Sequence, residues 1–364
     1  MTTKTDAVQS TAIVPYNPTL PHIAMKSRLE KVTDDVFRRS FEVAKFETSH
    51  LSPLSQKWIE NVVTQTALGV SHLYIDAEMG KRMASVIMRN MRQGNYNGLA
   101  NPFSFKEAVI KDIRSIYPDK HLDILCEKTP IPDFEPARSL NNIKDEDLTL
   151  EQRKYIESFE IDRPDFSKQV ESYIIPNTQI GYFKFNEFPN LKFPETRGVI
   201  DHSMKKVANA EALIIDLREN TGGYPETVAF IASYLFDKTQ LINQLYQRSN
   251  NEVTSFYAEP AKVGTAFGGT KPIYILTSER TFSAAEELAY DLQSAKRATV
   301  IGQTTKGGAH PIKPFVVDDH LYAIIPFRKA INPHTGTNWE GVGVKPDHLI
   351  AEEDALTHAL SLLK

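Results

Sequence analysis

The 364-residue chain contains one cysteine, Cys126, so no disulfide can form within it. No spacing of cysteine and histidine supplies the four ligands of a structural zinc site. Lysine and arginine are spread along the chain, and the formal net charge is −4. A nucleic-acid-binding protein would instead carry a basic stripe. We therefore expect no metal, no cofactor and no nucleic-acid partner.

Long hydrophobic runs are also missing. No run approaches the roughly 18 apolar residues that indicate a membrane-spanning helix. Residues 1–25 lack the unbroken apolar stretch of about 7 to 15 residues that a secretory signal places behind a basic segment. With 41% hydrophobic and 24% charged residues, the composition is that of a soluble globular protein. We expect a cytoplasmic protein that does not insert into membranes.

Four segments differ in their patterns. Residues 1–24 show no periodicity and predict a loose arm. Residues 25–127 place apolar side chains at intervals of three and four, which predicts a small all-helical domain. Residues 128–170 are rich in proline and aspartate and predict a linker. Residues 171–364 alternate strand-like and helix-like runs, which is typical of a largely parallel α/β core.

Two junctions in this core place polar residues between a strand and a helix. Such junctions collect functional groups, because backbone N–H groups are unpaired there and the helix field favours negative charge. The first, residues 218–223, ends in Gly222 and Gly223, whose small size suits an oxyanion hole but also an ordinary turn. Neither a dinucleotide-binding motif nor a P-loop is present there.

The second junction, residues 281–284, contains Ser283. Ser283 and Glu286 fit a helix-capping box, and the same serine could be a nucleophile if a base lies nearby. The candidate bases are His121, His310, His334 and the nearby lysines, and sequence distance does not choose among the three histidines. His310 follows Gly307 and Gly308 in a rigid loop, where it could line a cleft, act as a base or form a structural hydrogen bond.

Three stretches of the chain carry a recognisable combination of motifs: ALIIDLRENTGG, PIYILTSERTFSAAEELAYDLQSAKRATVIGQTTKGGAHP and NPHTGTNWEGVGVKPDHLI. Together they resemble the S41 serine peptidases, a family that includes C-terminal processing peptidases, tricorn protease and interphotoreceptor retinoid-binding proteins. The likeness is greatest to the retinoid-binding-protein-like branch, and it extends upstream to about residue 70. It implies a ClpP/crotonase-like core behind a helical domain.

The resemblance also implies roles for individual residues. Ser283 would be the nucleophile, His121 of the D-x-H motif the base, and Glu340 the carboxylate that orients the histidine. The backbone N–H groups of Ala284 and of Gly222 or Gly223 would bind the oxyanion. Trp339 would pack beside Glu340 and, with His310 and Lys306, could line the substrate cleft.

The chain departs from the family pattern in three ways. Gly308 stands where processing peptidases carry the lysine of a Ser-Lys dyad, and Lys306 lies two positions earlier. Lys306 could face the same way as that lysine if the segment is a strand. Lys120 replaces a serine that takes part in the tricorn site. No segment resembles the PDZ module that processing peptidases insert before the core.

Two hypotheses of different classes follow. The first is a serine endopeptidase that acts on extended polypeptides through an acyl-enzyme at Ser283. The second is a non-catalytic binding protein that holds an apolar, retinoid-like or fatty-acid-like ligand on the same fold. The sequence gives no indication of the oligomeric state or of the bond that is cleaved.

Overall fold

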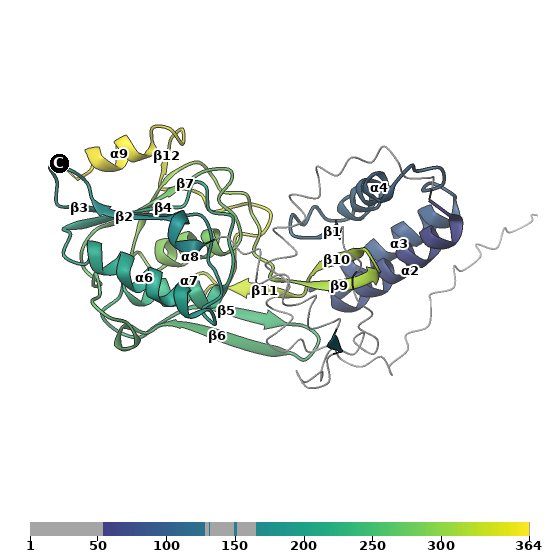
Figure 1. Cartoon of the computed structure of the whole chain (residues 1–364), viewed down its shortest axis with the longest axis horizontal. Helices are drawn as coiled ribbons and strands as arrows, with labels where there is room; N and C mark the ends of the chain where they lie inside the picture. Colours follow the sequence, from purple (N-terminus) through teal and green to yellow (C-terminus); the bar gives the residue numbers. More distant parts are fainter. Residues whose placement is uncertain (1–53, 128–130, 132–148, 151–164, 364) are drawn as a thin grey trace, which may run out of the picture.

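The computed structural model describes residues 54–127, 131, 149–150 and 165–363. The predicted arm (1–24), the start of the predicted helical domain and most of the predicted linker lie outside these residues. No helix within the described ranges is both long enough and apolar enough to cross a membrane. The described residues form two lobes, which Figure 1 shows side by side.

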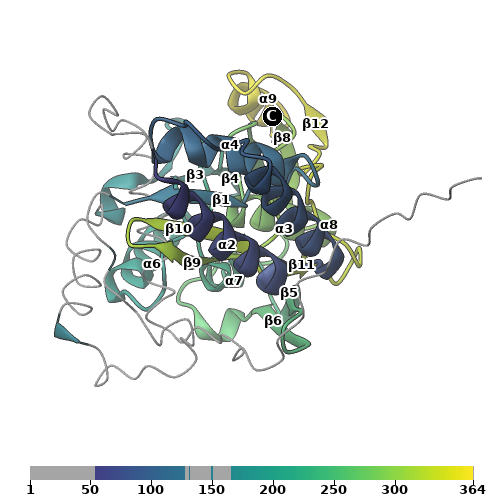
Figure 2. The ribbon, with the colours of Figure 1, turned by 90° about the vertical axis from the view of Figure 1, so that its right-hand side faces the viewer.

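The helical lobe consists of residues 54–127 together with residues 312–326. Each of its three helices begins where the sequence provides a capping side chain: Ser55, Asp76 and Asn101 each accept a hydrogen bond from a backbone N–H of the first turn. Figure 2 shows α2 and α3 side by side in front of a small sheet. The helices are α2 (Gln56–Leu73), α3 (Ala77–Arg92) and α4 (Pro102–Arg114).

The helical lobe also contains an antiparallel sheet, in the order β1-β10-β9. Gly69 of α2 lets this sheet approach closely, because a Cβ atom there would lie 2.8 Å from Phe315 and 2.9 Å from Ile325. The pattern of residues 25–127 predicts helices only, and it misses the sheet because two of the strands come from much later in the chain. The strands are β1 (Asp123–Cys126), β9 (Ile312–Asp318) and β10 (Leu321–Pro326).

The core lobe, residues 165–311 and 327–363, is built on a six-stranded sheet in the order β12-β8-β7-β4-β3-β2. Its strands are parallel except for the β2–β3 pair. This confirms the predicted α/β class. The strands are β2 (Val170–Ile174), β3 (Ile180–Phe185), β4 (Ala212–Asp216), β7 (Ile273–Thr277), β8 (Thr299–Gly302) and β12 (His348–Leu349).

Helices cover both faces of this sheet, and its central strand β4 is accordingly apolar from residue 212 to residue 215. Leu213 and Ile215 of β4 belong to the cluster formed with α6, α7 and α8, whereas Ile214 packs with residues of α9 on the other face. The helices are α6 (Pro194–Val207), α7 (Pro225–Ser233), α8 (Ala284–Ser294) and α9 (Ala355–Ser361), with short 3₁₀ turns η3 (Phe166–Gln169) and η4 (Pro260–Lys262).

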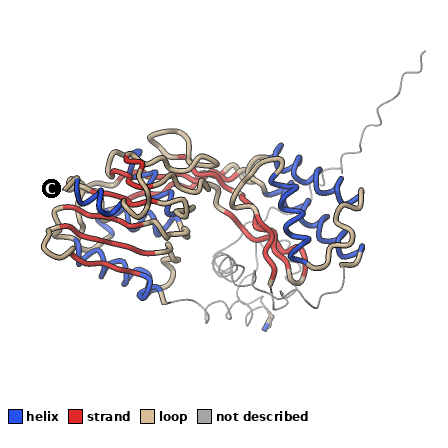
Figure 3. Tube along the Cα trace, turned by 90° about the horizontal axis from the view of Figure 1, so that it is seen from above, coloured by secondary structure: helices blue, strands red, loops and turns tan. Residues whose placement is uncertain are grey.

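A third sheet, in the order β11-β5-β6, lies where the two lobes meet. Figure 3, seen from above, shows strands between the core lobe and the helices of the helical lobe. Arg248, just after β5, donates to the Tyr74 carbonyl at 3.1 Å, and the Ile75 N–H donates to Pro326 at 2.9 Å. The strands are β5 (Gln240–Gln247), β6 (Glu252–Ala258) and β11 (Arg328–Ile331).

The contact between α2 and the β9–β10 hairpin predicts the effect of truncating Ile325, which is fully buried. Ile325→Ala removes apolar contacts and leaves a cavity, so the free energy of unfolding should fall by about 2–5 kcal/mol. Ile174→Ala, at a site where 38% of the residue is exposed, is the matched control and should cost less. Urea unfolding measures both, and equal losses would contradict the proposed packing.

Candidate active site

Ser283 is the N-cap residue immediately before helix α8, in the turn that follows β7. Its backbone has φ 55° and ψ −121°, a conformation that non-glycine residues rarely adopt and that is often found at functional sites. The Phe282 N–H donates to the Asn220 carbonyl at 3.1 Å, which places the two junctions of the core side by side. The serine is thus presented at the edge of the parallel sheet, at a helix N-terminus.

Glu286 holds the turn around Ser283 in place. Its buried carboxylate accepts hydrogen bonds from the N–H groups of Ser283 at 2.8 Å, Gly307 at 2.6 Å and Gly308 at 2.9 Å, and from the Thr305 hydroxyl. Burial raises the pKa of Glu286, and these hydrogen bonds oppose the shift. The sequence motif predicts only a helix cap here, whereas the carboxylate also fixes the loop of residues 305–308.

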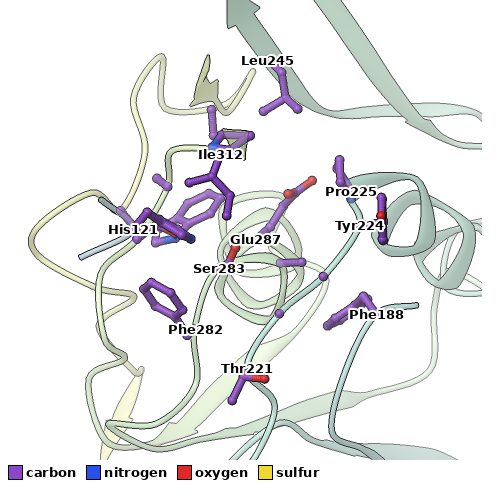
Figure 4. A pocket seen from close by; sticks show the side chains of 18 of the residues that line it. His121, Phe188, Thr221, Tyr224, Pro225, Leu245, Phe282, Ser283, Glu287 and Ile312 are labelled. Carbon is purple, nitrogen blue, oxygen red and sulfur yellow. The ribbon is translucent and has the colours of Figure 1, made fainter. Parts of the chain in front are cut away.

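His121 lies between α4 and β1 and is 3% exposed. Its ring stacks on Phe282 with ring centroids 4.3 Å apart. His121 and Ser283 line one pocket, although no hydrogen bond joins them in the described structure (Figure 4). Burial lowers the pKa of His121 to about 4, with the nearby Asp119 opposing the shift. The imidazole is therefore neutral near pH 7, which is the form that a general base requires.

The pocket has a volume of about 200 Å³ and lies between the lobes. Besides Ser283 and His121, it is lined by Gly222, Gly223, Ala284 and Trp339, so six residues predicted from the sequence meet there. Leu245 and Ile312 form apolar parts of the pocket wall. This pocket can hold a small group or one side chain of a longer substrate over the serine.

Asp119 organises the turn that carries His121. Its fully buried carboxylate accepts hydrogen bonds from the Tyr74 hydroxyl at 3.0 Å and the His121 N–H at 2.9 Å, and it pairs with His310 Nδ1 at 2.8 Å. Although burial opposes the shift, the bond to Asp119 raises the pKa of His310. His310 is not among the pocket-lining residues. Of its three predicted roles, the structure therefore favours the structural hydrogen bond.

Glu340 lies beside the same turn. One carboxylate oxygen, Oε2, accepts the Ala309 N–H at 2.6 Å, and the other, Oε1, is buried without a hydrogen-bond partner. His121 Nδ1 is likewise buried and unpaired. Burial, reinforced by the charge of Asp119, raises the pKa of Glu340 to about 7. Glu340 is therefore close to His121 but makes no hydrogen bond to it in this conformation.

One possible ligand atom from each of Asp119, His121 and Glu340 lies within 4.8 Å of the others. Such a trio could supply three of the four ligands that zinc takes in a structural site. The motif resemblance predicts that Glu340 lies beside His121, but it gives no indication of a metal site.

Trp339 packs beside this group. Its buried indole donates to the Gly308 carbonyl at 2.8 Å, which fixes the ring at one wall of the pocket.

The backbone N–H groups at the pocket differ in whether they are available to bind an oxyanion. The Gly222 N–H donates to the Asn220 side chain at 2.9 Å, so Gly222 does not serve as an oxyanion donor in this conformation. No described residue accepts a hydrogen bond from the N–H groups of Gly223 and Ala284. Gly222 is still required as glycine, because its φ is 108° and a Cβ atom would lie 2.7 Å from Ser283 Cβ.

The other predicted bases are not placed to act on Ser283. Lys306 lies in a loop and not in a strand, and its ammonium sits 4.4 Å from the centroid of the Phe282 ring. Lys306 does not line the pocket, and His334 is exposed elsewhere. Among the candidate bases in the described structure, only His121 shares a pocket with Ser283.

Residues 179–350 match the model of Peptidase family S41. The carboxy-terminal-processing protease of Bartonella bacilliformis is 25% identical over 325 residues, covering 82% of this chain and 71% of that protein. The chloroplastic carboxyl-terminal-processing peptidase 2 of Arabidopsis thaliana is 30% identical over 171 residues, covering 47% of this chain and 32% of that protein. The chain thus spans about a third of the second relative.

A solved structure of mature CPAF superposes with a TM-score of 0.55 at 11% sequence identity, covering 84% of this chain and 96% of that one. At this identity, the likeness shows the fold alone. The family match and the sequence relatives support Peptidase family S41 and indicate a serine-type peptidase. The retinoid-binding-protein-like branch stays a prediction.

The lowered pKa of His121 can be tested without turnover. We expect the His121 imidazole to remain neutral at pH 6 and to titrate near pH 4, because burial disfavours its cation. Histidine ring resonances followed by NMR between pH 3.5 and 8 measure this, with His121→Gln identifying the signal. A midpoint at or above the ordinary value of about 6.5 would contradict the buried, neutral base.

Proposed function

We propose that the protein is a serine endopeptidase that cleaves extended polypeptides through an acyl-enzyme at Ser283. The observation that carries the proposal is one shared pocket. It combines a conformationally restrained serine, a neutral histidine and two backbone N–H groups to which no described residue offers an acceptor. The processing activity named for the sequence relatives supports a polypeptide substrate. The reaction needs each of these groups in a distinct role.

In the proposed mechanism, His121 removes the proton of Ser283 as its oxygen attacks the scissile carbonyl. The tetrahedral oxyanion accepts hydrogen bonds from Gly223 and Ala284, each worth on the order of 3 kcal/mol in related chemistry. The imidazolium then protonates the leaving amine, and water activated by the same histidine hydrolyses the acyl-enzyme.

Glu340 has a positioning role in this mechanism. The unpaired Oε1 of Glu340 and the unpaired Nδ1 of His121 are complementary, because a hydrogen bond between them would satisfy both buried atoms. Such a bond would orient the ring and stabilise the imidazolium. We expect this hydrogen bond to form when a substrate binds between the lobes, because catalytic hydrogen bonds often tighten only in the complex.

The first test removes the nucleophile. Ser283→Ala should abolish both the hydrolysis of an unfolded casein substrate and covalent labelling by a peptidyl phosphonate, because both reactions require the serine oxygen. Gel assays and intact-mass spectrometry measure the two effects, and circular dichroism checks the fold. Labelling of the variant at the wild-type rate would remove Ser283 from the mechanism.

A second test separates the two candidate bases. His121→Gln should lower kcat by about 1,000-fold or more, as expected for the loss of a catalytic histidine. Lys306→Met, which keeps an apolar side chain next to Phe282, should stay within about threefold of the parent, because side chains outside the machinery contribute little to catalysis. The reverse ranking of the two variants would assign the base to Lys306.

The binding-protein hypothesis is less well supported. Pockets for drug-sized ligands usually measure about 300–1,000 Å³, and this pocket of about 200 Å³ is below that range. Its apolar walls suit part of a chain better than an entire retinoid. Tight binding of retinol or palmitate without any phosphonate labelling would favour a binding protein over the peptidase.

A further inference from the structure

Glu287 lies one helical turn after Ser283 on α8 and lines the same pocket, yet the proposed mechanism does not use it. The residue is 5% exposed, and its Oε1 has no hydrogen-bond partner. In Figure 4 the side chain extends between Ile312 and Pro225, below Leu245. Helix geometry sets the rise from Ser283 to Glu287 at about 6 Å.

The carboxylates that line the pocket, Glu287 among them, are not balanced by a basic side chain among the described lining residues. Glu187 also lines the pocket, and no lysine or arginine is among the lining residues in the described part of the chain. Burial raises the pKa of Glu287 to about 7; the nearby Asn243 side chain opposes the shift, and the charge of Glu226 adds to it. A buried carboxylate without a cationic partner is costly, so a cation that enters the pocket gains a favourable interaction.

A second carboxyl group lies behind Glu287. Asp291 follows one turn later on the same face of α8, is buried, and accepts a hydrogen bond from the Asn332 side chain at 2.8 Å. Burial, reinforced by the charge of Glu287, raises the pKa of Asp291 well above its ordinary value, which favours its neutral form. Asp291 does not line the pocket, so only Glu287 can contact a bound group there.

We propose that Glu287 determines specificity: its carboxylate binds the ammonium or guanidinium group of a lysine or arginine side chain next to the cleaved bond. The inference rests on the proposed function, which places the scissile carbonyl over Ser283. Glu287 is displaced from Ser283 by about 6 Å along the α8 axis, which is comparable to the reach of the four-carbon stem of a lysine side chain. Its methylene groups would pack on Leu245 and Ile312 while its charge meets the carboxylate.

The test measures binding and does not depend on turnover. In the Ser283→Ala protein, calorimetry compares two peptides that differ only in lysine or norleucine at the position before the bond. We expect the lysine peptide to bind about 10- to 100-fold more tightly. Adding Glu287→Gln should remove most of this preference and leave norleucine binding nearly unchanged.

Asp291→Asn in the same Ser283→Ala background is the matched control. It also removes a buried carboxyl from α8, but it should preserve the preference for lysine because it leaves the pocket surface intact. A norleucine preference in the parent would overturn the inference. So would a Glu287→Gln variant that weakens both peptides equally, because that result would indicate a purely structural role.

Steady-state assays of the otherwise intact chain separate this inference from the proposed function. If the chain cleaves lysine and norleucine peptides with equal kcat/KM, the specificity role fails while the peptidase stands. If it binds lysine peptides through Glu287 but cleaves none and resists phosphonate labelling, hydrolysis is contradicted and the selectivity of the pocket is supported.

Discussion

The stacking of His121 on Phe282 is the contact on which the site depends. Phe282 precedes the nucleophile candidate in the core lobe, whereas His121 follows α4 in the helical lobe. The close approach requires glycine at position 308, since a Cβ atom there would lie 2.3 Å from the Phe282 ring and 2.6 Å from His121. A lysine at this position, which the resemblance to processing peptidases would predict, would collide with the stacked pair. The position of His121 against Phe282 therefore depends on glycine at position 308.

Buried carboxylates make this arrangement rigid. Asp119 holds the histidine turn from one side, and Glu286 holds the serine turn and the glycine loop from the other. Each accepts several hydrogen bonds, which offsets the cost of burying its charge. Glu340 and Glu287 differ, because each keeps one unpaired buried oxygen. Glu340 and Glu287 can each form a further hydrogen bond or ion pair when a substrate binds. The carboxylates of Asp119 and Glu286 already accept several hydrogen bonds from the surrounding structure.

Much of the core could be predicted from the sequence, because its signals are local. The apolar run of β4 and the serine after β7 predict buried parallel strands and a strand–helix junction, and the structure contains both. The joining of β9 and β10 to the helical lobe could not be predicted in this way, since it pairs strands that are far apart in the chain. Periodicity reports which face of a segment is buried, but it does not report which partner buries it.

At the site, too, some features could be predicted from local motifs and others depend on contacts between distant segments. Motif resemblance predicts Ser283, His121 and Glu340 as site residues. The hydrogen bond from the Gly222 N–H to the Asn220 side chain depends on a side-chain rotamer, which no motif reveals. The sequence gives no reason to select Glu287, because a capping role for the adjacent Glu286 is enough to account for acidic residues at the start of α8. Only the three-dimensional arrangement shows that one of these glutamates supports the turn and the other lines the pocket.

The most direct measurement is a crystal structure of the protein after reaction with a peptidyl phosphonate. Our account requires the phosphorus to be bonded to Ser283 Oγ, with one phosphoryl oxygen within hydrogen-bond distance of the N–H groups of Gly223 and Ala284. It also requires a ring nitrogen of His121 within hydrogen-bond distance of Oγ or of a phosphonate oxygen, and Glu340 bonded to Nδ1. An adduct in which His121 stays remote, and another group approaches Oγ instead, would contradict the central claim.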